Sequence, residues 1–271
     1  MMLLSLFMTP ANGGFGLPQM SEKEMLERLL SEDPDRTDSE SQIASSIGEQ
    51  MLLMGLRTMP RSLRVRIRDI VSRVPLGNAI LVGGGIGHLS AWLFDLWCGD
   101  PSSPDDLSRE KPDSFIIVEE GARFGVIIDR LIRRYNAETW SRVVAKPWAE
   151  LTAEVTSWSA ASASLPSSAR PSDIPLPVSL VVIDLPDSER PAASYSAFDI
   201  LSPEGIMIVP EPEVPTGDVG VPGEGEDPTE AQAKVIAFNQ WISFIKEVSA
   251  NHSVSFVELS GGTLAVIRRA A

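Results

Sequence analysis

The glycine-rich run at residues 83–87 constrains the fold of this chain more than any other feature. It reads Gly-Gly-Gly-Ile-Gly, and it follows directly on the apolar stretch 79–82. The residues from His88 to Trp97 then have the apolar spacing of a helix. Because glycine has no Cβ, its backbone can approach a ligand where a side chain would collide. A glycine loop between a strand and a helix therefore predicts an α/β fold with a nucleotide-like ligand at this turn.

Downstream of this loop, short apolar runs alternate with amphipathic stretches. We expect further strands at 114–118, 140–145, 180–183 and 206–209, with helices at 122–135, 193–201 and 230–250. This alternation predicts a doubly wound, mostly parallel sheet with helices on both faces. The last two runs, 254–259 and 263–267, are joined through a Gly-Gly pair, which predicts a hairpin and an antiparallel strand at the end of the sheet.

Composition removes several classes of partner. The chain has 271 residues, with 37 acidic and 23 basic side chains and a net charge of −14. This charge argues against a nucleic-acid partner and against an anionic membrane surface. Cys98 is the only cysteine, so an intramolecular disulfide and a thiolate-rich zinc site are excluded. The apolar residues 1–8 are too few to span a bilayer and follow no basic residue, so we expect a cytoplasmic protein.

The chain divides into a leader and a larger domain. We expect a helical leader at residues 1–56, with a capping box at Ser21-Glu22-Lys23-Glu24 and an acidic loop at 31–41. The α/β domain covers 57–271 and is interrupted by a Ser-, Ala- and Pro-rich surface excursion at 156–177 and an acidic, mobile loop at 210–230. Six basic residues start this domain: Arg57, Arg61, Arg64, Arg66, Arg68 and Arg73. They are interpreted as a solvated helix face paired with the acidic leader, and the alternative is a phosphate-binding cluster.

Glu119 sharpens the ligand prediction. It ends the second strand, where a carboxylate can accept hydrogen bonds from both hydroxyls of a ribose. The alternative is a solvated strand end. A dinucleotide site typically shows GxGxxG, whereas this chain has His88 or Ser90 at the final glycine position. The pattern therefore favours a compact adenosine ligand over a dinucleotide.

Taken together, the strand–GGGIG–helix unit, Glu119, Asp184 after the fourth strand and the closing hairpin resemble a class I S-adenosylmethionine-dependent methyltransferase. Residues 50–268 are similar in particular to the cation-dependent O-methyltransferases, which include catechol and caffeoyl-CoA methylating enzymes. The segments that carry this similarity are GIGHLSAWL, VVIDLPD, LSPEGIMIV, IAFNQWI and SGGTLAVIRR. The resemblance implies a Rossmann-like, seven-stranded sheet, S-adenosylmethionine as cofactor, a small hydroxylated acceptor and, as in many relatives, a homodimer.

The resemblance also assigns site residues. It implies that the cofactor is bound by Gly83, Gly85, Gly87, His88, Glu119, Trp148 and Asp184. It places Asp184 at the metal and substrate end. Two family positions differ here, because Asp-Ala-Asp-Lys is replaced by Asp184-Leu185-Pro186-Asp187 and the Asp-Asn metal pair by Pro210-Glu211. A divalent cation such as Mg²⁺ would therefore depend on Asp184 and Glu211. Alternatively, Asp184, Asp187 or Glu211 acts as a catalytic base.

Two other functions stay open at this point. The first is an aminopropyltransferase similar to spermidine synthase, whose glycine loop is of the same kind. The second is a catalytically degenerate methyltransferase fold that binds a ligand or partner without turnover. Leu81, where the family has an acid, and Pro186 and Pro210 in the altered motifs favour that second alternative.

Overall fold

A single seven-stranded sheet organises the molecule. The computed structural model of the protein describes residues 21–34, 37–103, 105, 107–161, 172–217, 219–220 and 227–271. The strands are β1 (Asn78–Val82), β2 (Ser114–Val118), β3 (Ser141–Val144), β4 (Val178–Ile183), β5 (Leu201–Pro210), β6 (Ser253–Leu259) and β7 (Gly262–Arg268). Their order in the sheet is β3-β2-β1-β4-β5-β7-β6. Strands β1 to β5 pair in parallel, whereas β7 is antiparallel to both β5 and β6, so the predicted mixed sheet with a closing hairpin is confirmed.

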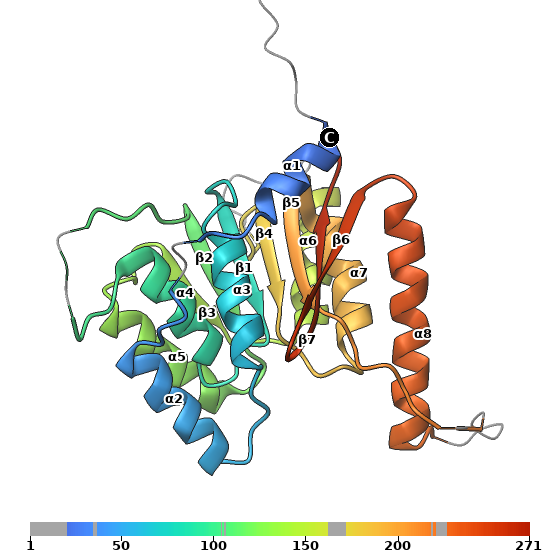
Figure 1. Cartoon of the computed structure of the whole chain (residues 1–271), viewed down its shortest axis with the longest axis horizontal. Helices are drawn as coiled ribbons and strands as arrows, with labels where there is room; N and C mark the ends of the chain where they lie inside the picture. Colours follow the sequence, from blue (N-terminus) through green and yellow to red (C-terminus); the bar gives the residue numbers. More distant parts are fainter. Residues whose placement is uncertain are drawn as a thin grey trace, which may run out of the picture.

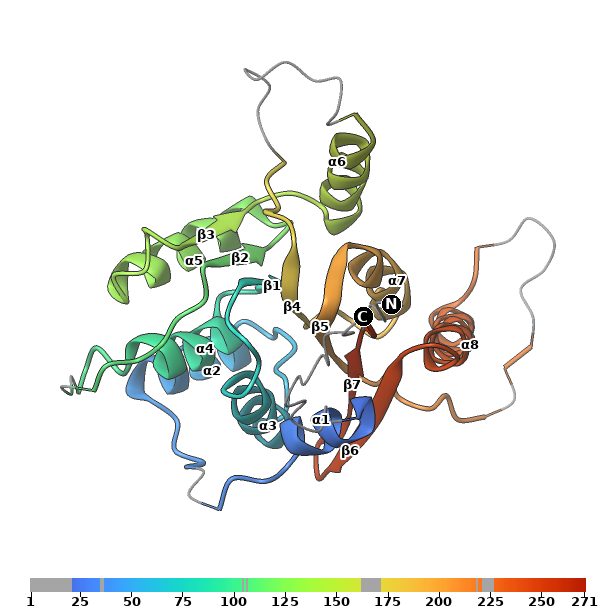
Figure 2. The same cartoon turned by 90° about the horizontal axis from the view of Figure 1, so that it is seen from above.

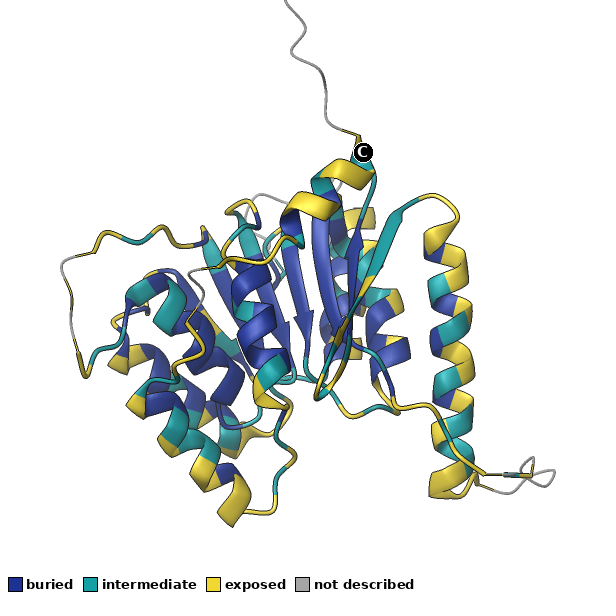
Figure 3. Ribbon diagram, in the orientation of Figure 1, coloured by how far each residue is buried: buried dark blue, intermediate teal, exposed yellow. Residues whose placement is uncertain are grey.

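Helices cover both faces of this sheet (Figures 1 and 2). They are α1 (Glu22–Leu29), α2 (Gln42–Leu53), α3 (Arg61–Val71), α4 (His88–Cys98), α5 (Ala122–Arg134), α6 (Trp148–Ala161), α7 (Arg190–Ile200) and α8 (Glu230–Ser249). Helices α1 to α5 contribute to one buried apolar cluster and α6 to α8 to another. The sheet lies between the two clusters, and Figure 3 shows its central strands as the most deeply buried part of the fold.

The central strand β1 shows why the sequence folds this way. Successive side chains of a strand point to opposite faces, so Ala79 and Leu81 join the first cluster and Ile80 and Val82 the second. All four side chains are buried. A parallel strand covered on both faces therefore has a continuous apolar sequence rather than an alternating one.

The leader packs against the α/β domain. Leu26 and Leu29 of α1 and Ile43 and Ala44 of α2 are buried in the same cluster as α3, α4 and α5. Helix α2 lies beside α4, and α1 contacts β6. Helices α1 and α2 of the leader thus form part of the hydrophobic core.

The arginines of α3 are less solvated than the sequence indicated. Three of them donate hydrogen bonds to the loop before α2. Arg61 donates to the Asp38 carbonyl, Arg64 to the Glu40 carboxylate and Arg68 to the Thr37 and Ser39 carbonyls. The predicted pairing with the leader is confirmed. However, the interpretation of a solvated face is wrong for Arg64 and Arg66, which are only 7% and 3% exposed. Their guanidinium groups donate to the backbone carbonyl oxygens of Met59 and Leu30, respectively, which need partners when buried.

Two predicted loops are only partly loops. The expected excursion at 156–177 begins inside α6, which continues to Ala161, and Ile174 near its end is buried in the core. Residues 162–171 of that excursion lie outside the described part of the chain. The expected acidic loop at 210–230 begins at the last residue of β5, and its residues 218 and 221–226 are likewise outside the description. Within the described ranges, no helix is both long and apolar enough to cross a membrane.

Candidate functional site

A pocket of about 290 Å³ lies where β1, β2 and β4 end. Its lining includes Met51, Leu56, Arg57, Gly83, Gly84, Gly85, His88, Leu89, Glu119, Glu120, Phe124, Lys146, Trp148, Asp184, Leu185, Pro186 and Glu189. Six of the predicted site residues are therefore brought together here: Gly83, Gly85, His88, Glu119, Trp148 and Asp184. Gly87, Asp187 and Glu211 are not among the residues that line it. The pocket occupies the carboxyl edge of a parallel sheet, the usual ligand position in such folds.

The glycine loop is shaped by its backbone angles. Gly83, Gly85 and Gly87 have φ values of +90°, +53° and +95°, a region that residues with a side chain rarely adopt. A Cβ on Gly83 would lie 2.3 Å from the carbonyl oxygen of Asp184, so the loop passes close to the end of β4. A Cβ on Gly85 would meet nothing within 4 Å. Gly85 therefore faces open space inside the pocket lining, where a ligand can approach its backbone.

Glu119 joins the glycine loop to the end of β2. Its Oε2 accepts a hydrogen bond of 2.6 Å from the Gly85 N–H, and its Oε1 accepts one of 3.0 Å from the Gly121 N–H. Burial raises the pKa of the Glu119 carboxyl group, and these two amide bonds counteract that shift. Each oxygen keeps a further lone pair, because a carboxylate can accept about four hydrogen bonds. Glu119 can therefore order the loop and accept hydrogen bonds from a ligand as well.

Trp148 begins α6 and forms another part of the lining. Its ring is held in place by the indole N–H, which donates to the Ser196 hydroxyl over 2.8 Å. The residue is only 9% exposed, so its ring presents a fixed apolar surface to the pocket. A flat apolar surface of this kind suits an aromatic ligand.

Each of the three predicted catalytic carboxylates already has a protein partner. Nη2 of Arg57 donates to the Asp184 carboxylate and, over 3.0 Å, to the Asp184 carbonyl oxygen. Asp187 forms a 2.7 Å ion pair with Arg190 and accepts the Glu213 N–H over 3.0 Å. Glu211 accepts a 3.2 Å hydrogen bond from the Trp241 indole. Asp184 alone of these three lines the pocket.

The residues present do not fit the divalent cation that the resemblance implies. Within the described ranges, no group of three or more His, Cys, Asp or Glu side chains is arranged to hold a metal ion. The carboxylate of Asp184 is bound by a guanidinium, whose positive charge would repel a cation at the same oxygen. The positive charge next to Asp184 is therefore supplied by Arg57.

Comparisons with known proteins bear on the fold. No family model and no curated protein sequence matches the chain. Among solved structures, an O-methyltransferase from Bacillus cereus in complex with S-adenosylhomocysteine matches with a TM-score of 0.53 and 14% identity, over 92% of this chain and 96% of that one. The O-methyltransferase TomG of tomaymycin synthesis from Streptomyces achromogenes, in complex with S-adenosylmethionine, matches with a TM-score of 0.54 and 11% identity, over 86% and 92%. A candidate caffeoyl-CoA O-methyltransferase from Staphylococcus aureus gives a TM-score of 0.54 and 13% identity, over 84% and 93%.

The chain has the fold of the class I S-adenosylmethionine-dependent methyltransferases. The predicted resemblance to this fold, including the caffeoyl-CoA type, is thereby confirmed at the level of the architecture. In this methyltransferase fold the glycine loop and Glu119 occupy the edge of the sheet that the sequence assigned to them.

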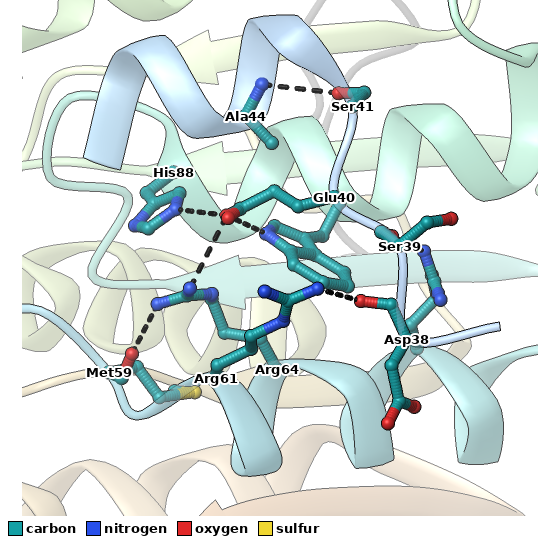
Figure 4. Close-up of polar contacts among 11 residues, drawn as sticks. Asp38, Ser39, Glu40, Ser41, Ala44, Met59, Arg61, Arg64 and His88 are labelled. Atoms are coloured by element: carbon teal, nitrogen blue, oxygen red, sulfur yellow. Dashed lines mark hydrogen bonds and ion pairs between the residues drawn. The ribbon is translucent and has the colours of Figure 1, made fainter. Parts of the chain in front are cut away.

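Sequence reasoning missed the contribution of the leader to the pocket. Met51 of α2 and the following Leu56 line it, next to Arg57, the first residue after the leader. It also missed the contact of His88 with the leader: this residue is only 6% exposed, and its Nε2 lies 3.0 Å from the Glu40 carboxylate (Figure 4). The only sequence signal for these contacts is the proximity of an acidic leader to an arginine-rich helix, which does not specify pairs of residues.

Proposed function

We propose that the protein is an S-adenosylmethionine-dependent methyltransferase. The observation that carries this proposal is the pairing of the Glu119 carboxylate with the Gly85 amide inside one pocket of a methyltransferase fold. Proteins of the same architecture from Bacillus cereus and Streptomyces achromogenes hold S-adenosylhomocysteine and S-adenosylmethionine in their structures. Glycine loop, carboxylate and aromatic ring give this chain the donor, acceptor and stacking groups that an adenosine ligand requires.

In the proposed complex each part of the lining has its own role. The free lone pairs of Glu119 accept the ribose hydroxyl groups, and the Trp148 ring lies beside the adenine. The methionine part of the cofactor lies along Gly83 to Gly85, where side chains are absent. His88 and Asp184 border the same part of the pocket from α4 and from the end of β4.

We propose further that the acceptor is a small hydroxylated molecule. Transfer joins the acceptor oxygen to the methyl carbon and breaks the bond from that carbon to sulfur, which releases S-adenosylhomocysteine. The hydroxyl proton leaves to a base, and Asp184 and Glu189 are the carboxylates that line the pocket on the β4 side. Alignment of the oxygen with the methyl carbon supplies most of the rate enhancement in such a displacement. No step in this mechanism passes through a metal ion.

Calorimetric titration tests the proposal. The protein is titrated with S-adenosylmethionine and with S-adenosylhomocysteine, once with Mg²⁺ and once with EDTA. We expect both compounds to bind, with the same affinity in the two buffers, because no residue group described here fits a cation. If neither compound binds, the proposed function is contradicted. Transfer is then measured as incorporation of labelled methyl groups into a mixture of small phenols, catechols and hydroxy acids.

A further inference from the structure

One carboxylate oxygen of the leader connects three elements of the fold. Oε1 of Glu40 accepts hydrogen bonds from Nε2 of His88 over 3.0 Å, from the Trp92 indole over 3.0 Å and from Nη2 of Arg64 over 3.3 Å (Figure 4). His88 and Trp92 belong to α4 and Arg64 to α3. Glu40 directly precedes Ser41, the N-cap residue of α2. The start of α2 is therefore fixed to α3 and α4 at a single atom.

The protonation states of this cluster follow from its surroundings. Burial raises the pKa of Glu40, but the His88 hydrogen bond, the Arg64 charge and the Trp92 hydrogen bond outweigh it and lower the pKa below its ordinary value. Burial and the Arg64 charge lower the pKa of His88. At neutral pH the pair is thus an ionised carboxylate and a neutral imidazole. The Nε2 atom must carry the ring hydrogen to donate to Glu40, which leaves Nδ1 as an acceptor.

The other end of α2 reaches the pocket. Met51 in its last turn lines the pocket, and so do Leu56 and Arg57 in the loop that follows. Between the two ends, Gly48 packs directly on the His88 ring, since a Cβ there would lie 2.9 Å from the ring carbon Cε1. We define residues 37–57 as the α2 segment. It is fixed by Glu40 at its start and borders the pocket at its end.

His88 takes part both in the Glu40 contacts and in the lining of the pocket. It contacts Glu40 and Gly48 on the α2 segment, and it also lines the pocket at the N-terminus of α4. A change in the position of His88 or of the α2 segment therefore alters the pocket lining itself.

We propose that Glu40 is a positioning residue for the cofactor. It holds the His88 ring and the α2 segment where they complete the pocket, so cofactor binding and docking of this segment stabilise each other. The inference rests on the proposed function, because it concerns the same pocket. Coupling of this kind is reciprocal: docking of the segment raises the affinity for the cofactor by the same factor by which the bound cofactor favours docking.

The test compares S-adenosylhomocysteine affinity, measured by calorimetry, among four variants of the full chain. Glu40→Ala removes the shared acceptor, and we expect it to weaken binding by roughly tenfold or more, since three donors lose their partner. Glu40→Gln keeps one acceptor oxygen without the charge and is expected to lie between Glu40→Ala and the unmodified protein. Gly48→Ala displaces the His88 ring without touching Glu40 and is expected to weaken binding as well. Glu49→Ala, on an exposed position of the same helix, is the matched control and keeps full affinity.

A second measurement separates positioning from simple loss of stability. Cleavage of the α2 segment by a glutamate-specific protease is followed with and without S-adenosylhomocysteine. We expect the ligand to slow cleavage after Glu49 in the unmodified protein and much less in Glu40→Ala. A variant that only destabilised the whole fold would lower the melting temperature but keep the ratio of protected to unprotected rates.

The outcomes are distinguishable. If the unmodified protein does not bind S-adenosylhomocysteine, the proposed function fails, and this inference fails with it. If it binds, but the folded Glu40 variants and Gly48→Ala keep its affinity and its protection, the role of Glu40 is refuted and the proposed function stands. If Glu40→Ala does not fold, Glu40→Gln and Gly48→Ala decide the question by the same criteria.

Discussion

On the β2 side of the pocket, the Glu119 carboxylate accepts backbone N–H groups from Gly85 and Gly121. On the β4 side, the Asp184 carboxylate is instead bound by the side chain of Arg57, which the α2 segment supplies from a distant part of the sequence. The contacts of Glu119 use backbone N–H groups of the turns that follow β1 and β2, and these two strands are neighbours in the sheet. The contact of Asp184 depends on the docking of a separate segment.

Under the proposed function, we infer that this difference separates the binding of the cofactor from the handling of the acceptor. The β2 side has the glycine loop and carboxylate that an adenosine ligand needs, within a fold that binds such ligands in other proteins. The β4 side departs from the metal-using pattern, because a guanidinium neutralises Asp184. We infer that the two sides respond differently to substitution.

Gly83→Ala is expected to have the largest effect, because it acts on the backbone that both sides share. Its Cβ would overlap the Asp184 carbonyl oxygen at 2.3 Å, at a φ of +90°. Backbone strain and steric overlap together predict a loss of about 2–5 kcal/mol in the free energy of unfolding, measured by urea denaturation. Gly217→Ala is the matched control, with a φ of +95° and nothing within 4 Å of the added Cβ. Equal losses in the two variants would show that strain alone, and not the contact with β4, requires glycine at position 83.

Glu119→Ala breaks the β2 side alone. Loss of charged hydrogen bonds to ribose hydroxyl groups predicts a decrease in S-adenosylhomocysteine affinity of about 10- to 100-fold, as measured by calorimetry. Glu138→Ala, at an exposed position after α5, is expected to keep full affinity. Unchanged binding in Glu119→Ala would remove the main argument for an adenosine ligand.

Arg57→Met tests the β4 side. It removes the partner of Asp184 and keeps most of the apolar length of the side chain. If this side handles the acceptor, S-adenosylhomocysteine affinity changes by less than about threefold, because the Glu40 contacts still hold the α2 segment and an exposed or half-exposed ion pair contributes only modestly. A loss as large as that of Glu119→Ala would mean that both sides serve the cofactor and that the division between them is wrong.

The smallest expected effect is on the pH dependence of the melting temperature, through His88 and its contact with the α2 segment. Burial and Arg64 lower the pKa of His88, while Glu40 and, more remotely, Asp184 raise it, with a net decrease from about 6.5. The folded state thus binds fewer protons than the unfolded state in this range. His88 contributes its full stability above about pH 6.5 and loses it as the pH falls through the lowered pKa. We expect the melting temperature to fall more between pH 7.5 and 5.5 in the unmodified protein than in His88→Asn, whose amide can still donate to Glu40. Parallel decreases in both proteins would exclude His88 as the titrating group.

The comparison also explains what the sequence could predict. The strand at 79–82, the glycine loop and Glu119 were predicted because their signals are local: buried parallel strands are apolar throughout, and glycine marks the positive φ angles of the loop. The pairing of Arg57 with Asp184 spans 127 positions, and that of Glu40 with His88 spans 48. No periodic pattern encodes such contacts, because they depend on how the leader packs in three dimensions. The burial of Arg64 was missed for the same reason, since an arginine-rich helix face has the pattern of a solvated one.

A crystal structure of the protein grown with S-adenosylhomocysteine in the presence of EDTA tests the central claim most directly. We expect the adenosine in the pocket at the ends of β1 and β2, with both ribose hydroxyl groups hydrogen-bonded to the Glu119 carboxylate, the adenine beside Trp148, and Arg57 still paired with Asp184. Electron density for the ligand at another site, or a pocket that stays free of it at saturating concentration, would contradict the account.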